Sequence, residues 1–266
     1  VMFWDSVVLG GYLALNIIIG WTTLNADKKG VMPPQWVKPL IYLSIPWAIS
    51  IHTVTAFLYA GLPGRHLWMS AIMAARFLAS AFAGGPALLI ILAMIVRKYT
   101  KFDPGKEAIQ ALGKIVTYAM IANVFFLGLE IFTALYSGIP GHAHPFEYLY
   151  LGIHGHGKLV PLMWISSVLA IVSLVLLIIP AIRKNEQMLI IACIALFLSL
   201  WIDKGFGLVI GGFVPNPFER VMEYWPTVPE AIITLSVWAV GFLILTVLYK
   251  VAVTVREETA DLKLKH

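Results

Sequence analysis

The stretch LVPLMWISSVLAIVSLVLLIIPAI, residues 159–182, decides the fold of this chain. It contains no Asp, Glu, Lys or Arg, and it exceeds the roughly 20 apolar residues that a helix needs to cross a bilayer. Six further stretches of the same kind surround it: residues 2–24, 37–60, 71–96, 110–137, 187–211 and 229–253. The sequence therefore predicts an all-α fold, a polytopic transmembrane helical bundle with seven spans.

The composition of the whole chain agrees with a membrane protein. Apolar residues make up 60% of the 266 residues, charged residues make up 12%, and the mean hydropathy is +0.86. A soluble domain is about half apolar and about a quarter charged. We expect one transmembrane helical domain over residues 1–266, embedded in a lipid bilayer. Since the chain opens on the apolar residues VMFW, without a basic segment or a cleavage site, we also expect further helices before residue 1 in the natural protein.

Basic residues predict the orientation of the bundle. The loops after the first, third and fifth spans, the C-terminal tail and the adjoining helix ends carry fourteen of them: Lys28, Lys29, Lys38, Arg97, Lys98, Lys101, Lys106, Lys114, Arg183, Lys184, Lys250, Arg256, Lys263 and Lys265. The opposite loops and helix ends carry four: Arg65, Arg76, Lys158 and Arg220. Because Lys and Arg accumulate on the cytoplasmic side, we expect a multi-pass protein of the cytoplasmic (inner) membrane with a cytoplasmic C-terminus. The net charge of +5 belongs to these loops and does not indicate nucleic-acid binding.

The cysteine and histidine content limits the cofactors that this chain can hold. Its single cysteine, Cys193, excludes an internal disulfide, a CxxC metal site and a CxxCH haem attachment. A haem with two histidine ligands needs two facing histidines in the membrane, and only His52 lies deep in a predicted span. We therefore expect no haem and no iron–sulfur cluster in this chain, so that any iron–sulfur cluster belongs to a partner.

Ionisable residues inside the spans are the first candidates for a functional site, because charged groups are costly at membrane depth. In the predicted topology six of them lie toward the same, outer face of the membrane: Asp5, His52, Arg76, Glu130, Asp203 and Lys204. This distribution indicates chemistry at one membrane surface and not a charge path across the whole bilayer.

His52 and Asp5 are the candidate proton-exchanging residues. Pro46 interrupts the hydrogen bonding of its helix one and a half turns before His52 and predicts a kink there. An imidazole near the outer third of the membrane can hydrogen-bond a quinone carbonyl and exchange a proton with it, and Asp5 can do the same. The alternatives are a structural histidine bonded to a neighbouring helix and a solvated carboxylate at a helix end.

The remaining membrane charges have structural alternatives as well. Arg76 and Glu130 can simply neutralise each other. Asp203 and Lys204 are adjacent, so their side chains diverge by about 100° on an α-helix and need not pair. Four glycines follow, at 205, 207, 211 and 212, and small residues of this kind predict a close packing seam between helices.

The predicted outer loops carry histidines and aromatic residues. His142, His144, His154 and His156 form two His-x-His pairs, which are more typical of surface docking or solvation than of a metal site in a glycine-rich loop. Residues 152–158 imitate a phosphate-binding GxxxxGK loop, but Leu159 replaces the required Ser or Thr and no strand precedes it. The aromatic residues near the outer ends are consistent with an interface belt: Trp4, Trp47, Trp68, Tyr224 and Trp225.

Several segments together resemble the NrfD/PsrC family, with the DsrP/HmcC branch most similar. They are Trp4-Asp5 through Asn16, the His52 segment, residues 62–69 with residues 76–80, and Asp203-Lys204-Gly205 through Pro215-Asn216-Pro217. The resemblance implies a subunit without its own redox cofactor that binds menaquinone or another quinone near the outer face. By this resemblance, seven residues are expected to bind the quinone: Asp5, Tyr12, Trp47, His52, Arg76, Glu130 and Asp203.

The resemblance also implies partners and a process. An outer-face iron–sulfur subunit would exchange electrons with the quinone. In the Dsr-type complex a multihaem cytochrome c, a b-type cytochrome membrane subunit and a cytosolic iron–sulfur protein accompany it, in sulfate or sulfite reduction. Two other classes stay open: a proton or solute transporter or channel subunit, for which Thr117, Tyr118, Asn123 and Ser166-Ser167 offer polar groups within the spans, and a purely structural membrane anchor.

Overall fold

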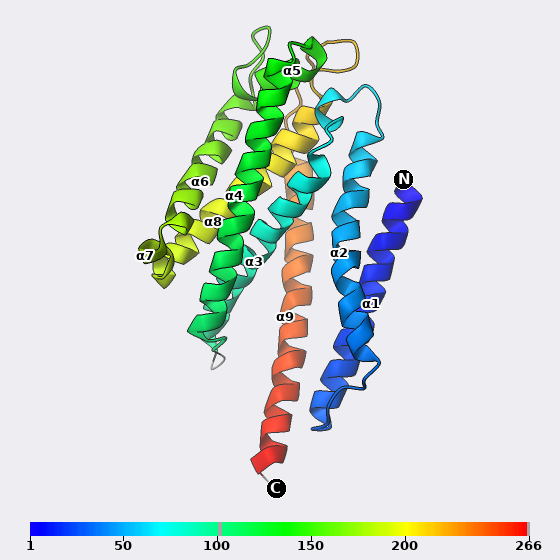
Figure 1. The fold of residues 1–266 in the computed structure, drawn as a ribbon, viewed down its shortest axis with the longest axis vertical. Helices are drawn as coiled ribbons and strands as arrows, with labels where there is room; N and C mark the ends of the chain where they lie inside the picture. The colour runs from blue at the N-terminus through cyan, green and yellow to red at the C-terminus, as the bar shows by residue number, and fades with distance from the viewer. Residues whose placement is uncertain (101–102, 265–266) are drawn as a thin grey trace. The chain divides into compact units, whose positions relative to one another are not determined.

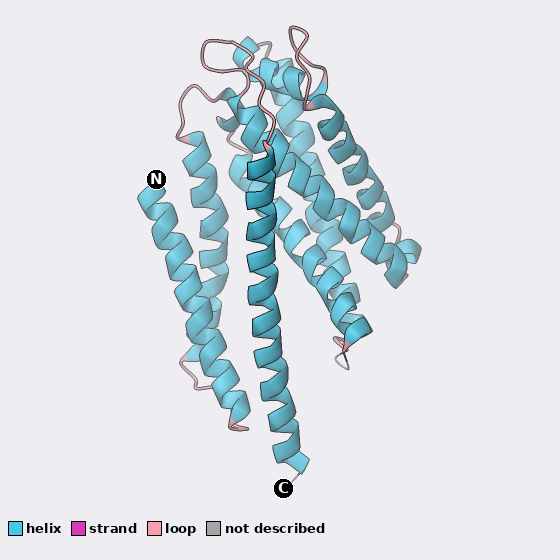
Figure 2. Ribbon diagram, turned by 180° about the vertical axis from the view of Figure 1, so that it is seen from behind, coloured by secondary structure: helices cyan, strands magenta, loops and turns pink. Residues whose placement is uncertain are grey.

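A computed structural model describes residues 1–100 and 103–264. Over these residues the chain is helical, without a strand, apart from one isolated bridge between Ile153 and His156 (Figures 1 and 2). Seven helical segments are long and apolar enough to span a membrane: Met2–Lys28, Val37–Ala60, Met73–Tyr99, Lys106–Tyr136, Val160–Ile178, Glu186–Phe213 and Val228–Val255. The predicted all-α, seven-span fold is confirmed. Lys101 and the side chains of Arg256, Lys263 and Lys265, which belong to the predicted basic face, lie outside the described residues.

The chain divides into two compact units, residues 1–54 with 225–266 and residues 55–224. Helix α2 (Val37–Ala60) begins in the first unit and ends in the second. The expectation of a single transmembrane domain stays a prediction, and each unit is described by itself below.

Four long helices build the second unit: α3 (Met73–Tyr99), α4 (Lys106–Tyr136), α6 (Val160–Ile178) and α8 (Glu186–Ile202). Helix α3 packs on α4 and α8, and α6 packs on α8 and α4. Alanines at positions 83 and 87 of α3 are fully buried, and such small residues let helices approach closely. Two reciprocal hydrogen bonds tie α6 to α8, because each of Ser166 and Ser199 donates its hydroxyl to the backbone carbonyl of the other, at 2.9 and 2.8 Å.

Short elements complete the second unit. The helices α5 (Pro140–Tyr150) and α7 (Pro180–Arg183) lie on either side of α6 in sequence, and the 3₁₀ turn η1 (His66–Trp68) precedes α3. After α8 the chain continues as a π-helical segment η2 (Asp203–Ile210) and a 3₁₀ turn η3 (Gly211–Phe213). Figure 1 shows α5 and η2 toward the same end of this unit, where the site described below lies.

The first unit consists of α1 (Met2–Lys28), the first part of α2 and α9 (Val228–Leu264). Helix α1 packs on α9, and the indole nitrogen of Trp47 on α2 donates to the carbonyl of Val8 on α1, at 2.8 Å. The Trp47 ring lies against Gly11, where a Cβ atom would come within 2.4 Å of it. Most apolar side chains of α1 and α9 are exposed within the chain, as expected for helices that face lipid.

Two expectations for the segments near the span ends differ from the structure. The predicted loop between the spans 110–137 and 159–182 contains a helix, since α5 occupies Pro140–Tyr150 with Pro140 at its first turn, where proline is favoured. Trp68 does not belong to an interface belt: its side chain is buried, and its indole donates to the carbonyl of Leu208 at 2.7 Å. Trp4 and Trp225 remain exposed, as an aromatic belt requires.

Candidate functional site

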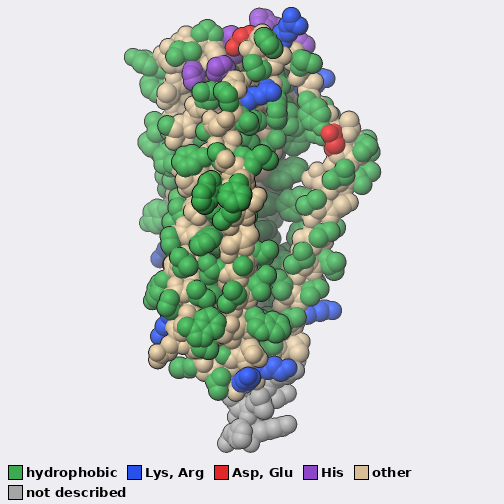
Figure 3. Space-filling view, turned by 90° about the vertical axis from the view of Figure 1, so that its right-hand side faces the viewer, with side chains coloured by type: hydrophobic (Ala, Val, Ile, Leu, Met, Phe, Trp, Pro, Cys, Tyr) green, Lys and Arg blue, Asp and Glu red, His purple; other side chains and the backbone are tan. Residues whose placement is uncertain are grey.

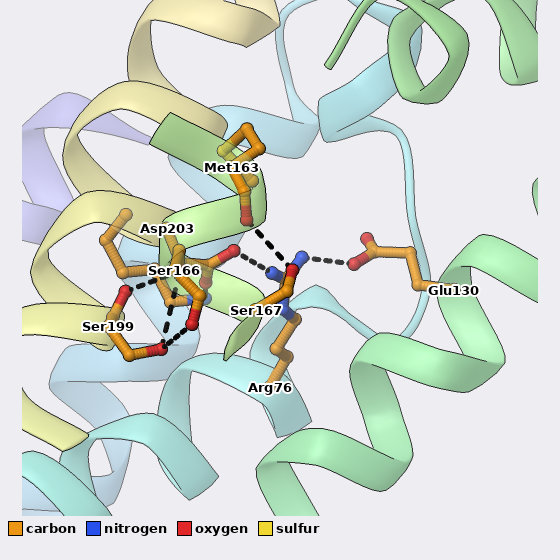
Figure 4. Close-up of polar contacts among 8 residues, drawn as sticks. Arg76, Glu130, Met163, Ser166, Ser167, Ser199 and Asp203 are labelled. Atoms are coloured by element: carbon orange, nitrogen blue, oxygen red, sulfur yellow. Dashed lines mark hydrogen bonds and ion pairs between the residues drawn. The ribbon is translucent and has the colours of Figure 1, made fainter. Parts of the chain in front are cut away.

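A buried arginine lies between two carboxylates in the second unit (Figure 4). Arg76 donates through Nη2 to Asp203 Oδ1 at 2.6 Å and through Nη1 to Glu130 Oε2. The three residues come from α3, α4 and η2, and each is only 6% exposed. The expected neutralisation of Arg76 by Glu130 is confirmed, with Asp203 as a second partner.

The helix pattern explains why these three side chains meet. On α4 the buried residues recur at 116, 120, 123, 130 and 134, so Glu130 continues the face that packs on the neighbouring helices. On α3 the buried residues recur at 73, 76, 79, 83, 87 and 90. Asp203 follows the buried Ser199 by four residues in the same way. The three charged residues therefore belong to the buried faces by which these helices pack on one another.

Lys204 completes the charged cluster, defined here as Arg76, Glu130, Asp203 and Lys204. The ammonium of Lys204 lies 3.4 Å from Asp203 Oδ2, so the two side chains do pair, although α-helical geometry did not require it. The wider turn of the π-helix is the reason, since consecutive residues diverge there by less than on an α-helix. Lys204 Nζ also lies 5.0 Å from the centre of the Phe77 ring, within reach of a cation–π interaction.

The charged cluster contains two positive and two negative groups, and some of its polar atoms have no hydrogen-bond partner. Three of its buried atoms make no hydrogen bond: Arg76 Nε, Asp203 Oδ2 and Lys204 Nζ. The Lys204–Asp203 contact is thus an ion pair without hydrogen-bond geometry. Buried polar atoms are nearly always satisfied, so these three are available to water or to a substrate group.

A cavity of about 330 Å³ adjoins the charged cluster, with Glu130 in its wall. Most of the lining surface is apolar, and it is formed by Leu67, Met69, Ala71, Ile72, Ala134, Ile139 and Phe146. The polar lining residues are His66, Ser70, Glu130, Thr133, Ser137 and His142. Thr133, Ser137 and Ile139 are exposed at its edge. A mainly apolar cavity with a few converging polar groups is the usual form of a small-molecule site.

A second cavity, of about 290 Å³, lies between the end of α2 and the start of α3. It shares Met69, Ser70 and Ala71 with the first cavity, so this short segment separates the two. Its other lining residues are apolar: Ala56, Phe57, Ala60, Met73 and Ala74.

Glycines bring η2 and η3 close to their neighbours on the other side of the charged cluster. A Cβ at Gly207 would lie 2.9 Å from Met163 Cε, and one at Gly211 would lie 2.7 Å from Leu149 Cδ2. At Gly212 it would lie 2.1 Å from Trp68 Nε1, whereas Gly205 has open space. The predicted packing seam is therefore present at positions 207, 211 and 212 and absent at 205.

Two acidic residues of the segment before α9 pair with two of the histidines between α4 and α6, His144 and His156. Glu223 accepts hydrogen bonds from the Lys158 amide at 2.8 Å and from the Tyr148 hydroxyl at 3.4 Å, and His156 Nδ1 lies 3.4 Å from it. Glu219 pairs with His144 Nδ1 at 2.8 Å. Burial opposes ionisation of Glu223, but the Lys158 amide and His156 outweigh it and lower the pKa of the carboxyl. Burial, with Glu223 adding to it, raises the pKa of Tyr148 to about 12.

These contacts pair histidines with carboxylates without building a metal site. Among the described side chains, those of residues 1–100 and 103–255, no three of His, Cys, Asp or Glu converge on a point where they could hold a metal ion.

Tyr150 links α5 to the charged cluster. Its half-buried phenol has a raised pKa, chiefly because of burial and also because of the negative charge of Asp203. Arg76, Tyr150 and Asp203 line one small void together with Met163 and Leu208.

The other predicted site residues lie in the first unit. Asp5 and Tyr12 on α1 are half-buried, as are Trp47 and His52 on α2. Trp47 contacts α1 at Val8 and Gly11, one residue before Tyr12. Of the seven residues predicted to bind quinone, the structure brings Arg76, Glu130 and Asp203 together in the second unit.

The comparisons with known proteins identify the family. The family described as "Polysulphide reductase, NrfD" matches residues 1–215. The chain belongs to the NrfD family. This match includes α1, α2 and every helix of the charged cluster and its cavity, so the site lies within the family's shared region.

Two relatives of this NrfD protein are named as subunits of reductases. A putative membrane subunit of the dimethyl sulfoxide reductase of Halobacterium salinarum is 24% identical over 281 residues, which cover 91% of this chain and 63% of the relative. A subunit of the selenate reductase of Mesobacillus selenatarsenatis is 24% identical over 252 residues, which cover 86% of this chain and 55% of the relative. The chain thus spans little more than half the length of these relatives.

Sequence reasoning alone missed part of this NrfD site. It treated His142 as a surface histidine and gave no role to His66, Ser70, Thr133 or Ser137, all of which line the cavity. One signal was available, because Glu130, Thr133 and Ser137 stand at i, i+3 and i+7 and share one helix face.

Proposed function

We propose that this NrfD protein is the quinone-reactive membrane subunit of a reductase complex, with the quinone headgroup in the 330 Å³ cavity beside Glu130. The observation that carries the proposal is a buried, arginine-held carboxylate in the wall of a mainly apolar cavity. The volume falls at the lower end of the range for small-molecule sites, roughly 300–1,000 Å³, which suits a ring with its tail outside. Hydroxyl, carboxylate and imidazole groups in the lining match the two oxygens of a quinone.

The chemistry divides between this chain and a partner. Oxidation of a hydroquinone releases two electrons and two protons. Glu130 accepts a proton as a general base, and Arg76 fixes the position of its carboxylate. With a single cysteine the chain lacks the ligands of an iron–sulfur cluster, so the electrons pass to an iron–sulfur subunit at the membrane face that carries α5.

The finer assignments belong to the same proposal. The substrate is menaquinone, and the process is the sulfate or sulfite reduction of the DsrP/HmcC branch. The complex would then add a multihaem cytochrome c, a b-type cytochrome membrane subunit and a cytosolic iron–sulfur protein. We place the protein in the cytoplasmic membrane with its C-terminus inside. Reductase complexes are the context that the names of the two relatives support.

Asp5 and His52 remain candidates for proton exchange with the quinone, and Tyr12 and Trp47 for its binding. All four lie in the first unit, and Glu130 lies in the second. A comparison of variants in both units therefore shows which of them forms the site.

The test is quinol-dependent electron transfer by the assembled complex. We expect Glu130→Gln to lower the rate by about 10²-fold, the usual scale for losing a general base. His52→Ala is expected to do the same if the first unit contributes. Glu219→Gln, an equally conservative change at the surface pair with His144, is the control and should keep the rate. Full activity of Glu130→Gln, in a complex that retains its subunits, would show that quinol oxidation does not take place in this cavity.

Binding is measured separately with a fluorescent hydroxyquinoline N-oxide, an analogue of the quinone ring. Thr133 is exposed at the cavity edge, so Thr133→Phe fills the cavity without disturbing the core. This variant should lose analogue binding.

Proton translocation is the second candidate function. Its support is the polar group of Asn123, whose Oδ1 is buried without a hydrogen-bond partner on the buried face of α4, between Glu130 and Thr117. Arg183 on α7, which follows α6, donates to Thr117 Oγ1 at 3.4 Å. Proton uptake into sealed vesicles that Asn123→Leu abolishes, with quinol oxidation intact, would favour this candidate.

A further inference from the structure

We infer that His66 and His142 form a proton gate at the cavity, which passes protons between the reacting quinone and the outer water. The inference rests on the proposed quinone site and assigns a role to two residues that only the fold brings together. His66 belongs to η1 and His142 to α5, yet both line the cavity that contains Glu130.

The two imidazoles form a close pair. Their ring centroids are 5.8 Å apart, with an angle of 62° between the ring planes. The ring of His66 lies on Gly141, where a Cβ atom would come within 3.2 Å of His66 Nε2. Gly141 thus leaves room for the His66 ring directly beside His142.

A row of polar side chains on α4 lines the same cavity as this pair. Glu130, Thr133 and Ser137 lie along one face of α4, and all three line the cavity. At 1.5 Å per residue, the row extends for about 10 Å. Thr133 donates to the Leu129 carbonyl at 2.7 Å and Ser137 to the Ala134 carbonyl at 2.9 Å, so each oxygen can still accept a hydrogen bond from the cavity. Ala134, the remaining α4 residue of the lining, is apolar, so the row forms the polar part of the α4 wall.

The charges around the pair leave it available for proton exchange. Within the lining of the cavity, the titratable groups are Glu130, His66 and His142. The neighbouring charged groups are engaged elsewhere: Arg65 donates to the Phe213 carbonyl and stacks on its ring, and His144 pairs with Glu219. Among the described residues, no carboxylate lies within ion-pair distance of His66 or His142. A neutral imidazole has one nitrogen that donates and one that accepts, so each ring can take a proton on one side and give one up on the other.

The proton balance is simple. One hydroquinone loses the hydrogens of its two O–H bonds and becomes a quinone. Its two electrons reduce the iron–sulfur centres of the partner subunit. Its two protons pass one after the other to Glu130 and then to the imidazole pair, through water in the cavity that donates to the Thr133 and Ser137 oxygens. Each imidazole then releases its proton to water. Quinone reduction uses the same route in reverse.

The first test is chemical modification of histidines in the intact complex, followed by mass spectrometry. Diethyl pyrocarbonate should modify His66 and His142 in the free complex, and saturating hydroxyquinoline N-oxide should protect both. Exposed His154 is the internal control, and its modification should not change. Equal modification of His66 and His142 with and without bound analogue would overturn their place beside the quinone.

The second test is the double variant His66→Gln, His142→Gln. We expect it to retain analogue binding, because glutamine keeps a hydrogen-bonding group at both positions of the lining. It should lose quinol-dependent turnover by about 10²-fold, because an amide does not carry a proton, and regain it with added free imidazole. The control is His154→Asn, because asparagine tolerates the left-handed backbone at this position, with φ of 50°. Its turnover and pH profile should equal those of the wild type.

The outcomes separate the two proposals. If the wild type does not bind the analogue, or if Thr133→Phe binds it unchanged, the quinone cavity itself is wrong. If the analogue binds in the cavity but the double variant keeps full turnover and the wild-type pH profile, only the proton gate is wrong. Loss of turnover without rescue by imidazole also contradicts the gate, since a structural role alone would produce it.

Discussion

Arg76 shows how a membrane protein keeps charged side chains at low cost. Removing ions from water is expensive, and the attraction between them offsets this only with good geometry and balanced charge. Arg76 meets both carboxylates with separate nitrogens, and Lys204 provides the second positive charge. The arrangement fixes Glu130 in the cavity wall, so one side chain serves both the stability of the fold and the proposed chemistry.

The first prediction at this scale concerns Arg76→Ala. It leaves Glu130 and Asp203 buried without their shared partner, and breaking a buried ion pair costs about 3–5 kcal/mol. Thermal unfolding in detergent should show a large loss of stability. Arg97→Ala is the matched control: Arg97 and Glu186 are about a quarter exposed, and pairs near the surface contribute roughly 0–1 kcal/mol.

A neutral version of the charged cluster separates stability from function. Combining Arg76→Met, Glu130→Gln, Asp203→Asn and Lys204→Met removes all four charges together, so no charge is left unpaired. We expect it to recover most of the stability lost in Arg76→Ala but none of the quinol-dependent activity. Arg76→Ala with wild-type stability would contradict the buried ion-pair network.

At the scale of elements, the packing of η3 on η1 positions one wall of the site. Gly212→Ala would place a methyl group 2.1 Å from Trp68 Nε1, the atom that donates to Leu208. We expect a loss of about 1–3 kcal/mol, the usual cost of overpacking, in the same unfolding assay. Gly205→Ala, in open space on the preceding turn, is the control and should be close to neutral. Equal stability of the two variants would show that the seam can open without cost.

The elements differ in how well the sequence predicts them. The seven spans follow from apolar length alone, and their observed bounds agree with the expected ones to within a few residues. The sequence does not predict helix α5, because Pro140, Gly141 and Pro145 give this segment the composition of a loop. The Asp203–Lys204 ion pair is not predicted, because the sequence does not predict the π-helix that turns the two side chains together. The sequence does not predict the cavity either, because its lining comes from η1, α4 and α5, whose contacts depend on tertiary packing.

At the scale of the whole molecule, the face seen in Figure 3 carries mainly hydrophobic side chains, and histidines gather at one end of it. In the second unit, α6 separates the His154 segment from Lys184, which lies directly after α7. If α6 crosses the bilayer, these two positions must face opposite compartments.

Single cysteines therefore test the proposed orientation. Lys28→Cys and Lys184→Cys lie in exposed segments on the predicted cytoplasmic side, and His154→Cys lies in an exposed turn on the predicted outer side. Native Cys193 is buried within the second unit and gives a low background. A membrane-impermeant maleimide added to intact cells should label position 154 and leave 28 and 184 unlabelled until the membrane is opened. The reverse pattern would place α5, the cavity and its two histidines toward the cytoplasm, so that protons from the quinone would be released inside.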